Sequence, residues 1–411
     1  MKNCAFTICA KNYLAQAFSL KESFLKYNNN FEFYIFLSDL KGSNLVPDDV
    51  FELDEKWIPD WKVMAFKYNV IEFSTSIKPF CFNKLFIAGY DKIVYLDPDI
   101  YVTSSLLPIY KMLDNKSIVM TPHYCNIQNE YTGSVSEEKL LFVGIYNLGF
   151  VAIKNDEFGN KIIQWWCRRL KNKCYADAYD SLHVDQRWMD FVPAFFPDNV
   201  LITHHLGINS AIWNLHERYL DAEDGTYIVV NSETKERFPL LFFHFSGFDP
   251  FNPEVLNRRH PKYNLEMYPS FRPLVKEYIE AEYRNGYETY SKLPYSLNSF
   301  SDGSLIFPIY RRLYRAIEQE LPVEDPFDSH SAFVKTLKKN GLFYNRKIQS
   351  IYPVNHDARL QKKRVYTKAL LHLFSILRKC IGIDYYSSLL FFLYDFSRFE
   401  SQKFMIKHIV K

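Results

Sequence analysis

The chain has 411 residues with a formal net charge of +3; 18% of the residues are aromatic and 24% are charged. This composition excludes a disordered acidic chain and a low-complexity sequence, and the near-neutral charge argues against duplex nucleic acid as a partner. The seven cysteines are scattered and contain no C-x-x-C pair, which argues against a disulfide framework and a zinc knuckle and favours a reducing compartment.

The first elements predict two strands joined by a helix. Residues 4–10 and 31–37 are short apolar runs, and residues 15–27 between them have apolar side chains at helical spacing. Strand, helix and strand in such quick succession are typical of a parallel sheet. The segment around the first strand has neither a long apolar stretch nor a small-residue cleavage site, so we expect a cytoplasmic location.

The same alternation continues toward the middle of the chain. A helix over residues 80–88 is followed by Gly89 as its stop and by a buried strand at 92–96. Further elements are expected in this order: strands at 117–121 and 149–153, helices at 159–170 and 184–191, and an apolar run at 239–245. We therefore predict an α/β fold whose central sheet is mainly parallel and flanked by helices.

The character of the sequence changes near residue 250. Beyond it, prolines, tyrosines and charges cluster, and strand-like runs become fewer. We predict a main domain over residues 1–250 and a mostly helical extension over residues 251–411.

The end of this extension combines basic and apolar residues. Between residues 361 and 411, ten lysines and arginines stand against three acidic residues, a balance of +7 that leaves −4 for the rest of the chain. Apolar side chains recur there at helical spacing, at Leu370, Phe374, Leu377 and Ile381, and then in the run 389–394. Basic groups beside an apolar face are typical of a helix lying on an anionic membrane surface, and the run is too short to span a bilayer. Peripheral attachment at the inner face of the cell membrane is one interpretation; packing of the tail on the protein or on a second subunit is the other.

The most informative motif is Asp97-Pro98-Asp99, which follows the apolar strand 92–96. Two carboxylates two positions apart at the end of a strand point to the same side, where they repel each other. A hard divalent cation, Mn²⁺ or Mg²⁺, would relieve this repulsion and keep coordination sites for diphosphate oxygens. Surface turns also produce this triplet by chance, but the buried strand before it favours a metal site.

Around this motif the chain resembles the GT-A glycosyltransferases, and among them family 8, which includes bacterial lipooligosaccharide galactosyltransferases and glycogenin, or a closely related family. Six segments occur in the family's order: 6–13, 78–85, 95–99, 146–150, 185–186 and 244–247. The resemblance covers about residues 4–250. It implies a GT-A fold with a Rossmann-like sheet, in which residues 1–250 form the nucleotide-sugar-binding catalytic domain.

The resemblance implies a role for each matching residue. The metal ligands would be Asp97, Asp99 and His244, and the reacting groups beside the donor sugar would be Asp185 and Gln186. The donor-binding residues would be Ala10, Asn12, Tyr13, Lys78, Lys84, Asp97, Asn147, Gly149, Asn209 and Gly247. The polar and aromatic stretch before His244 is expected to form part of the sugar or acceptor pocket, since sugars stack on rings and need paired hydrogen-bonding groups: Trp213, Asn214 and His216.

Each of these residues also has an ordinary structural explanation when taken alone. His244 fits a hydrogen-bonded core histidine, Asp185 a helix cap, and Trp213 a packing residue. Only the ordered set of segments favours the functional interpretation.

Two departures from the family pattern concern the charges that hold the diphosphate. The lysine that usually comes three residues after the glycine of the last segment is replaced by Pro250, and the arginine of the second segment is replaced by Lys84. The charge clamp is therefore expected from Lys78, Lys84 or Arg187.

These observations predict a metal-dependent transfer of a hexose from a UDP-sugar to a carbohydrate or lipid-linked acceptor, in the synthesis of cell-surface polysaccharide. The cation would offset charge on the departing phosphate, and Asp185 or Gln186 would stabilise the developing oxocarbenium ion. The resemblance implies retention of the anomeric configuration. Two alternatives stay open. A noncatalytic scaffold that partners another transferase has no reason to keep all three metal ligands, and a metal-dependent phosphohydrolase needs more acid and histidine ligands than the motifs supply.

Overall fold

The computed structural model describes residues 2–42, 45–53, 55–223, 225–344 and 356–410, and only the backbone of residues 356–366. The chain forms two compact units: Met1–Met64 with Val70–Ser296, and Ala65–Asn69 with Leu297–Lys411. The larger unit thus extends beyond residue 250. The boundary predicted at residue 250 is one of function: it separates a catalytic domain from an extension. The division into compact units does not test such a boundary, so it stays a prediction.

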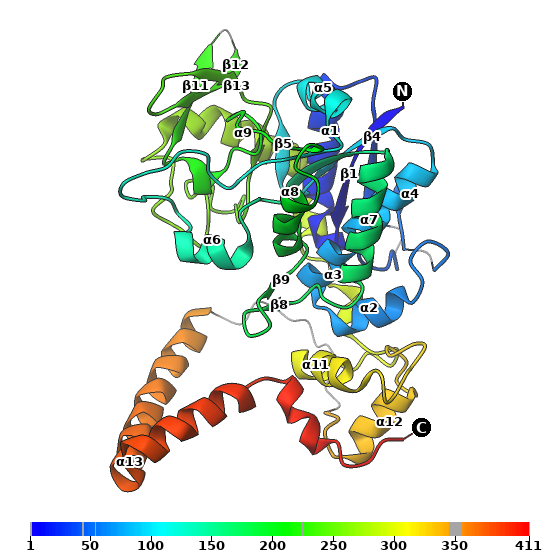
Figure 1. Ribbon diagram of the computed structural model, residues 1–411, viewed down its shortest axis with the longest axis vertical. Helices are drawn as coiled ribbons and strands as arrows, with labels where there is room; N and C mark the ends of the chain where they lie inside the picture. The colour runs from blue at the N-terminus through cyan, green and yellow to red at the C-terminus, as the bar shows by residue number, and fades with distance from the viewer. Residues whose placement is uncertain (1, 43–44, 54, 224, 345–355, 411) are drawn as a thin grey trace. The chain divides into compact units, whose positions relative to one another are not determined.

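The larger unit is built on a seven-stranded sheet in the order β10-β6-β7-β4-β1-β2-β3 (Figure 1). Neighbouring strands are parallel except where β7 pairs with β4 and with β6. The strands are β1 (Asn3–Cys9), β2 (Glu32–Leu37), β3 (Val50–Phe51), β4 (Lys92–Leu96), β6 (Ile118–Met120), β7 (Phe150–Lys154) and β10 (Val200–Ile202). The predicted α/β class with a mainly parallel sheet is confirmed.

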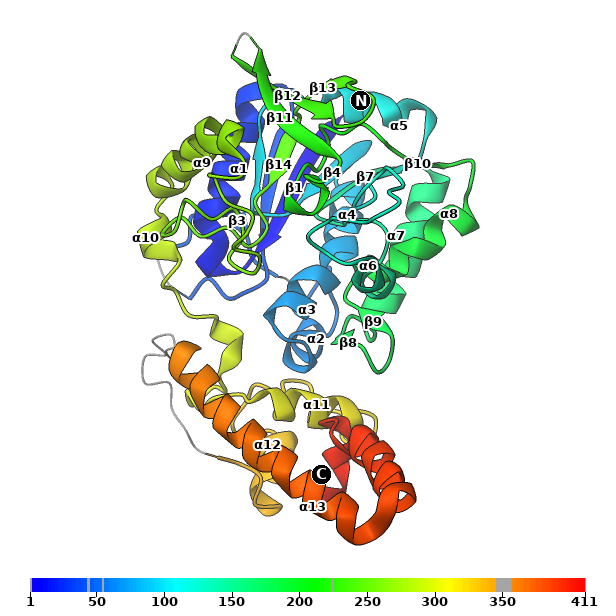
Figure 2. The ribbon, with the colours of Figure 1, turned by 90° about the vertical axis from the view of Figure 1, so that its left-hand side faces the viewer.

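Helices cover both faces of this sheet, as alternate residues of β1 illustrate. Ala5 belongs to the apolar core that includes residues of α1 and α5, whereas Phe6 packs edge-on against Phe82 of α4, with 4.8 Å between ring centroids. The helices of the larger unit up to residue 170 are α1 (Leu14–Tyr27), α3 (Val70–Ser76), α4 (Lys78–Ile87), α5 (Leu107–Asn115), α6 (Glu137–Val143) and α7 (Glu157–Leu170), and α2 (Trp61–Lys67) begins in this unit and ends in the smaller one. Figure 2 shows α1 on one side of β1 and β4, with α4 and α7 on the other. Every residue of β4 is buried, because a parallel strand needs a layer on each face.

The predicted helix at 184–191 is wrong in its type and in its end. Residues Gln186–Phe191 form a 3-10 helix, and α8 follows directly at Val192–Phe195, across Pro193. Proline lacks only a hydrogen-bond donor that the first turn of a helix does not use, so Pro193 lies at the start of a helix where the pattern predicts an end.

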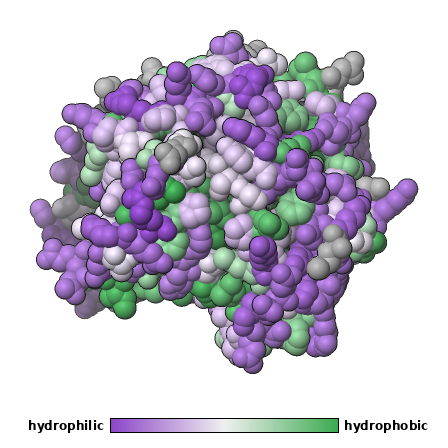
Figure 3. All heavy atoms as spheres, turned by 90° about the horizontal axis from the view of Figure 1, so that it is seen from above, coloured by the Kyte–Doolittle hydropathy of each residue, from purple (hydrophilic) through white to green (hydrophobic). Residues whose placement is uncertain are grey.

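The sequence pattern also does not predict a second, antiparallel sheet in the larger unit. Its strands are β11 (Arg218–Glu223), β12 (Thr226–Asn231) and β13 (Arg237–Pro239). Together with α9 (Arg272–Arg284) it encloses a separate apolar core. The view from above shows mainly hydrophilic side chains with small hydrophobic patches between them (Figure 3). The apolar residues of both cores are therefore largely covered on this face.

The smaller unit is helical, as predicted for the C-terminal region. Its elements are α11 (Pro308–Ile317), α12 (Ala332–Lys339), α13 (His356–Phe396) and a 3-10 helix at Glu400–Met405. Arg311 of α11 is buried and donates to the main-chain oxygens of Ala65, Phe66 and Tyr68. These bonds join the two chain segments of the unit.

Helix α13 carries an apolar surface that the rest of the unit leaves uncovered. It is broken at Gly382, which has a φ of 77°. Phe391 is 76% exposed and Leu371 is 64% exposed. The basic residues at 362–364 lie outside the described side chains. Across the described part of the chain, no helix has the length and apolar character needed to cross a membrane.

Candidate active site

The candidate site lies where β4 ends. Asp97 and Asp99 follow this strand in a turn that Ile100 N closes on the main-chain oxygen of Asp97 at 3.1 Å. β5 (Ile100–Val102) pairs antiparallel with β14 (Phe242–His244), which places His244 opposite Ile100. Phe245 N then donates to the main-chain oxygen of Asp99 at 2.8 Å. Main-chain hydrogen bonds thus fix two segments that are far apart in the sequence.

Three side chains of the kind that binds metals converge at this point. Nε2 of His244 lies 3.1 Å from Oδ1 of Asp99 and 3.8 Å from Oδ2 of Asp97. One ligand atom from each residue lies within 4.8 Å of the others. Burial opposes the charged forms, but the attraction between the imidazole and the carboxylate outweighs it, so the pKa of Asp99 is lowered and the pKa of His244 is raised. Two carboxylates and an imidazole are a donor set that fits Mn²⁺ or Mg²⁺.

The His244 ring is oriented from its far side by Asn209. Nδ1 of His244 lies 3.2 Å from Oδ1 of Asn209. The amide nitrogen of Asn209 donates instead to Oγ1 of Thr121 and to Oδ1 of Asn147, each at 3.1 Å. The amide oxygen therefore accepts from Nδ1, which carries the hydrogen in this assignment. Nε2 donates to Oδ1 of Asp99 while the ring is charged, and it presents a lone pair to the side where the two carboxylates lie once that proton has left.

Gly149 is required here because the His244 ring lies directly against it. A Cβ at position 149 would be 2.3 Å from Cε1 of His244. Gly149 N donates to Oδ1 of Asn147 at 3.0 Å, and its carbonyl accepts from Asp97 N at 2.8 Å. Asn147 and Gly149 therefore hold both the metal motif and the histidine.

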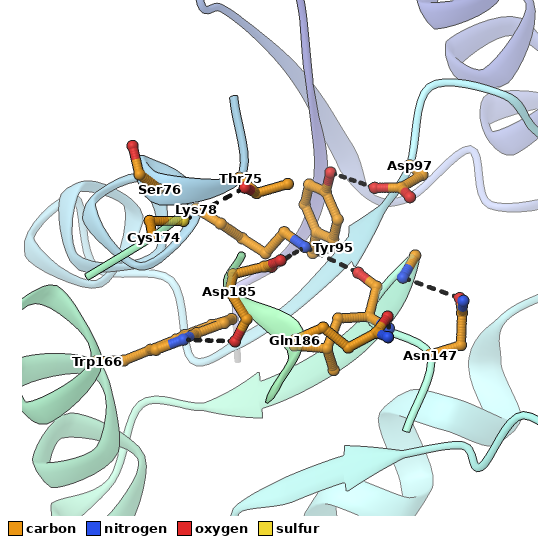
Figure 4. Close-up of polar contacts among 12 residues, drawn as sticks. Thr75, Ser76, Lys78, Tyr95, Asp97, Asn147, Trp166, Cys174, Asp185 and Gln186 are labelled. Carbon is orange, nitrogen blue, oxygen red and sulfur yellow. Dashed lines mark hydrogen bonds and ion pairs between the residues drawn. The ribbon is translucent and has the colours of Figure 1, made fainter. Parts of the chain in front are cut away.

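A buried ion pair between Lys78 and Asp185 lies near Asp97 (Figure 4). Nζ of Lys78 donates to Oδ2 of Asp185 at 2.5 Å and to the carbonyl of Leu148 at 2.8 Å, and it lies 4.1 Å from the centre of the Tyr95 ring. The Tyr95 hydroxyl donates to Oδ1 of Asp97 at 2.5 Å. Burial raises the pKa of Asp185, although the Lys78 ammonium opposes this. Asp185 is thus linked to the metal motif through Lys78 and Tyr95.

Gln186 is held by main-chain groups at both ends of its amide. Oε1 accepts from Leu148 N at 3.1 Å, and Nε2 donates to the carbonyl of Val143 at 2.9 Å. The main-chain oxygen of Asp185 accepts from Nε1 of Trp166 at 3.3 Å. The two predicted reacting residues are therefore fixed next to the start of β7. The second hydrogen of Nε2 and the second lone pair of Oε1 allow a contact with a sugar without replacing either bond.

A cavity of about 330 Å³ opens beside Asp97 and Asp99. Four of the predicted donor-binding residues line it: Ala10, Asn12, Tyr13 and Asp97. Other lining residues belong to no motif that would predict a binding site: Val70, Ile71, Ser74, Thr75, Leu293 and Tyr295. The first four lie on a helix without a motif, and the last two lie beyond residue 250, where no site residue is predicted.

The predicted acceptor residues lie on the Asn209 side of the histidine. The Trp213 ring packs edge-on against the His244 ring, with 5.0 Å between centroids, and the His216 ring packs against Tyr131 at the same distance. Nε1 of Trp213, both ring nitrogens of His216 and the Tyr131 hydroxyl are buried with no hydrogen-bond partner among the described residues. Groups of this kind usually bind water or a ligand. Asn214, by contrast, uses its amide on main-chain groups.

The structure places the remaining predicted residues apart from the cavity lining. Nζ of Lys84 lies 4.8 Å from the centre of the Trp57 ring, and Lys84 does not line the cavity. Arg187 forms an ion pair with a neighbouring aspartate. Gly247 has a φ of 73° and lies against Asn257. Lys84 and Arg187 therefore contribute no free charge at the triad.

Comparisons with known proteins agree with this architecture. Residues 4–176 match the model of glycosyl transferase family 8. Two uncharacterized proteins of Bacillus subtilis (strain 168) are similar. YfnF is 23% identical over 261 residues, which are 60% of this chain and 82% of YfnF, and YfnD is 22% identical over 254 residues, which are 59% of this chain and 76% of YfnD.

Solved structures of two glycosyltransferases are also similar. The galactosyltransferase LgtC, in complex with donor and acceptor sugar analogs, is 14% identical with a TM-score of 0.41, and the match covers 71% of this chain and 97% of LgtC. The bifunctional glycosyltransferase WbbM in its apo form is 15% identical with a TM-score of 0.41, and the match covers 71% of this chain and 51% of WbbM. Similarity at this level gives no information about the donor or the acceptor.

A mainly parallel sheet with one reversed strand, with paired carboxylates at the end of a central strand and a histidine beside them, defines a glycosyltransferase of the GT-A type. The predicted enzyme class is confirmed. More narrowly, the part of the chain that matches a family model, residues 4–176, is similar to glycosyl transferase family 8.

Proposed function

We propose that the protein transfers a hexose from a UDP-sugar to a carbohydrate or glycolipid acceptor, with a divalent cation held by Asp97, Asp99 and His244. The observation that supports this most is the convergence of these three side chains beside the cavity lined by Asn12 and Tyr13. A cation at this place, Mn²⁺ or Mg²⁺, would polarise the diphosphate and make it a better leaving group.

The residues of the chain supply the rest of the site. Asp97 accepts from Tyr95 through one oxygen and presents the other toward His244, so both carboxylates are directed before any donor enters. Lys78 holds Asp185 in place next to the start of β7. Asp185 and Gln186 are the groups that we assign to the reacting side of the donor sugar, with retention of configuration. Such groups act by stabilising positive charge that develops at the anomeric carbon.

The acceptor pocket in this proposal is the polar aromatic region around Trp213 and His216. Unpaired ring nitrogens and a buried tyrosine hydroxyl are suited to the hydroxyl groups of a sugar, and the rings are suited to its apolar face. Its contact with the His244 ring places this region next to the cation site. This arrangement supports a carbohydrate acceptor.

We also propose that α13 attaches the enzyme to the inner face of the cell membrane, where lipid-linked acceptors of cell-surface polysaccharide synthesis are found. The exposed apolar side chains of α13 and the basic balance of the tail support this. The seven free cysteines agree with a cytoplasmic setting.

The proposal is tested with the purified protein and a panel of UDP-, GDP-, ADP- and dTDP-sugars, with Mn²⁺, with Mg²⁺ and with EDTA. The measured quantity is release of the nucleoside diphosphate. We expect UDP release from a UDP-hexose that stops with EDTA. Release that continues with EDTA would contradict the metal role, turnover of another nucleotide sugar would correct the donor, and turnover of none would favour the noncatalytic scaffold.

A further inference from the structure

The cations expected to hold the diphosphate are occupied elsewhere. Lys78 is buried and paired with Asp185. Arg187 is paired with Asp190, and Lys84 lies over an indole ring. A nucleoside diphosphate carries about three negative charges, and one divalent cation faced by two carboxylates leaves most of that charge unbalanced. A diphosphate at this site therefore needs positive side chains that the sequence motifs do not identify.

The loop over residues 252–265 brings basic side chains to the end of β14. Arg258 N donates to the carbonyl of Gly247 at 3.0 Å, and Nδ2 of Asn257 donates to the carbonyl of Ser246. Arg259 N is held by Oδ1 of Asn257 at 2.8 Å. Ser246 and Gly247 are the second and third residues after His244, so these bonds attach the main chain of both arginines to the segment that carries the metal ligand.

Gly247 makes this attachment possible. Its φ of 73° is in the region that favours glycine, and a Cβ there would be 2.9 Å from Nδ2 of Asn257. Asn257 and Leu256 are both buried, so the base of the loop is part of the packed structure. The arginines thus project from a rigid support.

The two guanidinium groups themselves are free. Arg258 and Arg259 are exposed, and neither side chain has an ion pair or hydrogen bond with a described residue. Their charges nevertheless reach the site. Burial raises the pKa of the Tyr13 hydroxyl, and the charges of both arginines lower it in part. Tyr13 and Asp99 both line the cavity, and the loop that carries the two arginines is attached to the segment that follows His244.

We propose that Arg258 and Arg259 bind the diphosphate of the nucleotide donor and supply the charge clamp at this site. The inference rests on the proposed function, because it concerns the same donor. Guanidinium groups bind phosphate oxygens through two parallel hydrogen bonds, and two adjacent arginines offer enough donors for both phosphates. A diphosphate bound at the triad would be held by these two arginines and by the cation that Asp97, Asp99 and His244 would bind.

The test compares binding of UDP and UMP to the full chain in the presence of Mn²⁺, by isothermal titration calorimetry. The variants are Arg258→Ala, Arg259→Ala and the double substitution. The matched control is Lys262→Ala, which removes an exposed positive charge from the same loop. We expect the double variant to lose UDP affinity by about 30-fold or more, since a hydrogen bond between charged groups contributes about 1.5–3 kcal/mol. UMP affinity should fall by less than about threefold, because UMP lacks the second phosphate, and Lys262→Ala should change neither.

Two results would overturn the inference while leaving the proposed donor intact. One is a double variant that binds UDP as tightly as the wild type does; the other is an equal loss for UDP and UMP. A variant with lysine at both positions should keep part of the UDP affinity, which separates lost charge from a disturbed loop. If the wild type binds none of UDP, GDP and ADP with Mn²⁺, the proposed function itself fails, and this inference fails with it.

Discussion

At the scale of single residues, the site depends on the orientation of His244. Asn209 fixes Nδ1 as the protonated nitrogen, so Nε2 is left for a cation that Asp97 and Asp99 also bind. His244→Ala should weaken Mn²⁺ binding by about tenfold or more, as loss of one of three protein ligands implies. Its melting temperature without metal should change by only a few degrees. A variant that keeps the Mn²⁺ affinity of the wild type would return His244 to the role of a core histidine.

The reacting pair has a different expected signature. Asp185→Asn keeps the shape of the side chain but removes the charge that faces Lys78. We expect kcat to fall by about 100-fold or more while the affinity for UDP falls by less than about threefold, because the charge acts mainly on the transition state. Equal losses in kcat and in UDP affinity would make Asp185 a donor-positioning residue.

Glu282 is the buried acid on α9 that has no assigned role. Its Oε2 has no hydrogen-bond partner among the described residues, and burial raises its pKa to about 8. The folded protein therefore keeps a proton that the unfolded chain releases above about pH 4.5. The free energy of unfolding should fall as the pH rises from about 4.5 through 8, because ionisation is easier in the unfolded state.

The Glu282→Gln variant has no ionisable group at this position, so its free energy of unfolding should not fall in this way as the pH rises. At pH 8.5 and with EDTA, urea unfolding should show the variant to be more stable than the wild type by about 4 kcal/mol, and the difference should disappear near pH 4.5. Glu280→Gln, an exposed substitution on the same helix, is the control and should leave the pH profile unchanged. A stability difference that is the same at both pH values would contradict the assignment.

At the scale of secondary-structure elements, the sequence pattern predicts the parallel part of the sheet well and the antiparallel part poorly. The strand at 92–96 is confirmed because it is a continuous apolar run, which a strand buried on both faces requires. Strands β11 to β13 have exposed faces and mixed composition, so their pairing depends on contacts with the second apolar core rather than on local pattern.

Helix α13 gives a prediction at this scale. Phe391 and Phe392 are exposed, and replacing both with serine should lower binding to vesicles of three parts phosphatidylcholine and one part phosphatidylserine by about tenfold or more. Binding should also fall with added salt. Phe251→Ser, at an exposed phenylalanine of the larger unit, is the matched control and should bind as the wild type does. A wild-type protein that does not sediment with these vesicles would favour the interpretation that the tail packs against protein.

At the scale of the whole molecule, only the part of the candidate site that lies in recognisable sequence motifs could be predicted. Asp97, Asp99 and His244 are found together as expected, because β5 pairs with β14 and so brings together two segments that are far apart in the sequence. The roles of Arg258 and Arg259 could not be predicted, since a loop with two arginines is ordinary in sequence. The proposed role of this loop depends on the main-chain hydrogen bonds that attach it to the segment after His244. The site roles assigned from motifs remain predictions for the experiments above.

The central claim is that three residues hold one divalent cation at the place where a nucleoside diphosphate binds. Titration of the wild type with Mn²⁺, followed by electron paramagnetic resonance of the free ion, tests it most directly when done with and without UDP. We predict one site that UDP makes at least about tenfold tighter, because the diphosphate completes the coordination. Asp99→Asn should abolish the site. An Asp99→Asn variant that binds one Mn²⁺ as the wild type does, with the same response to UDP, would contradict the account.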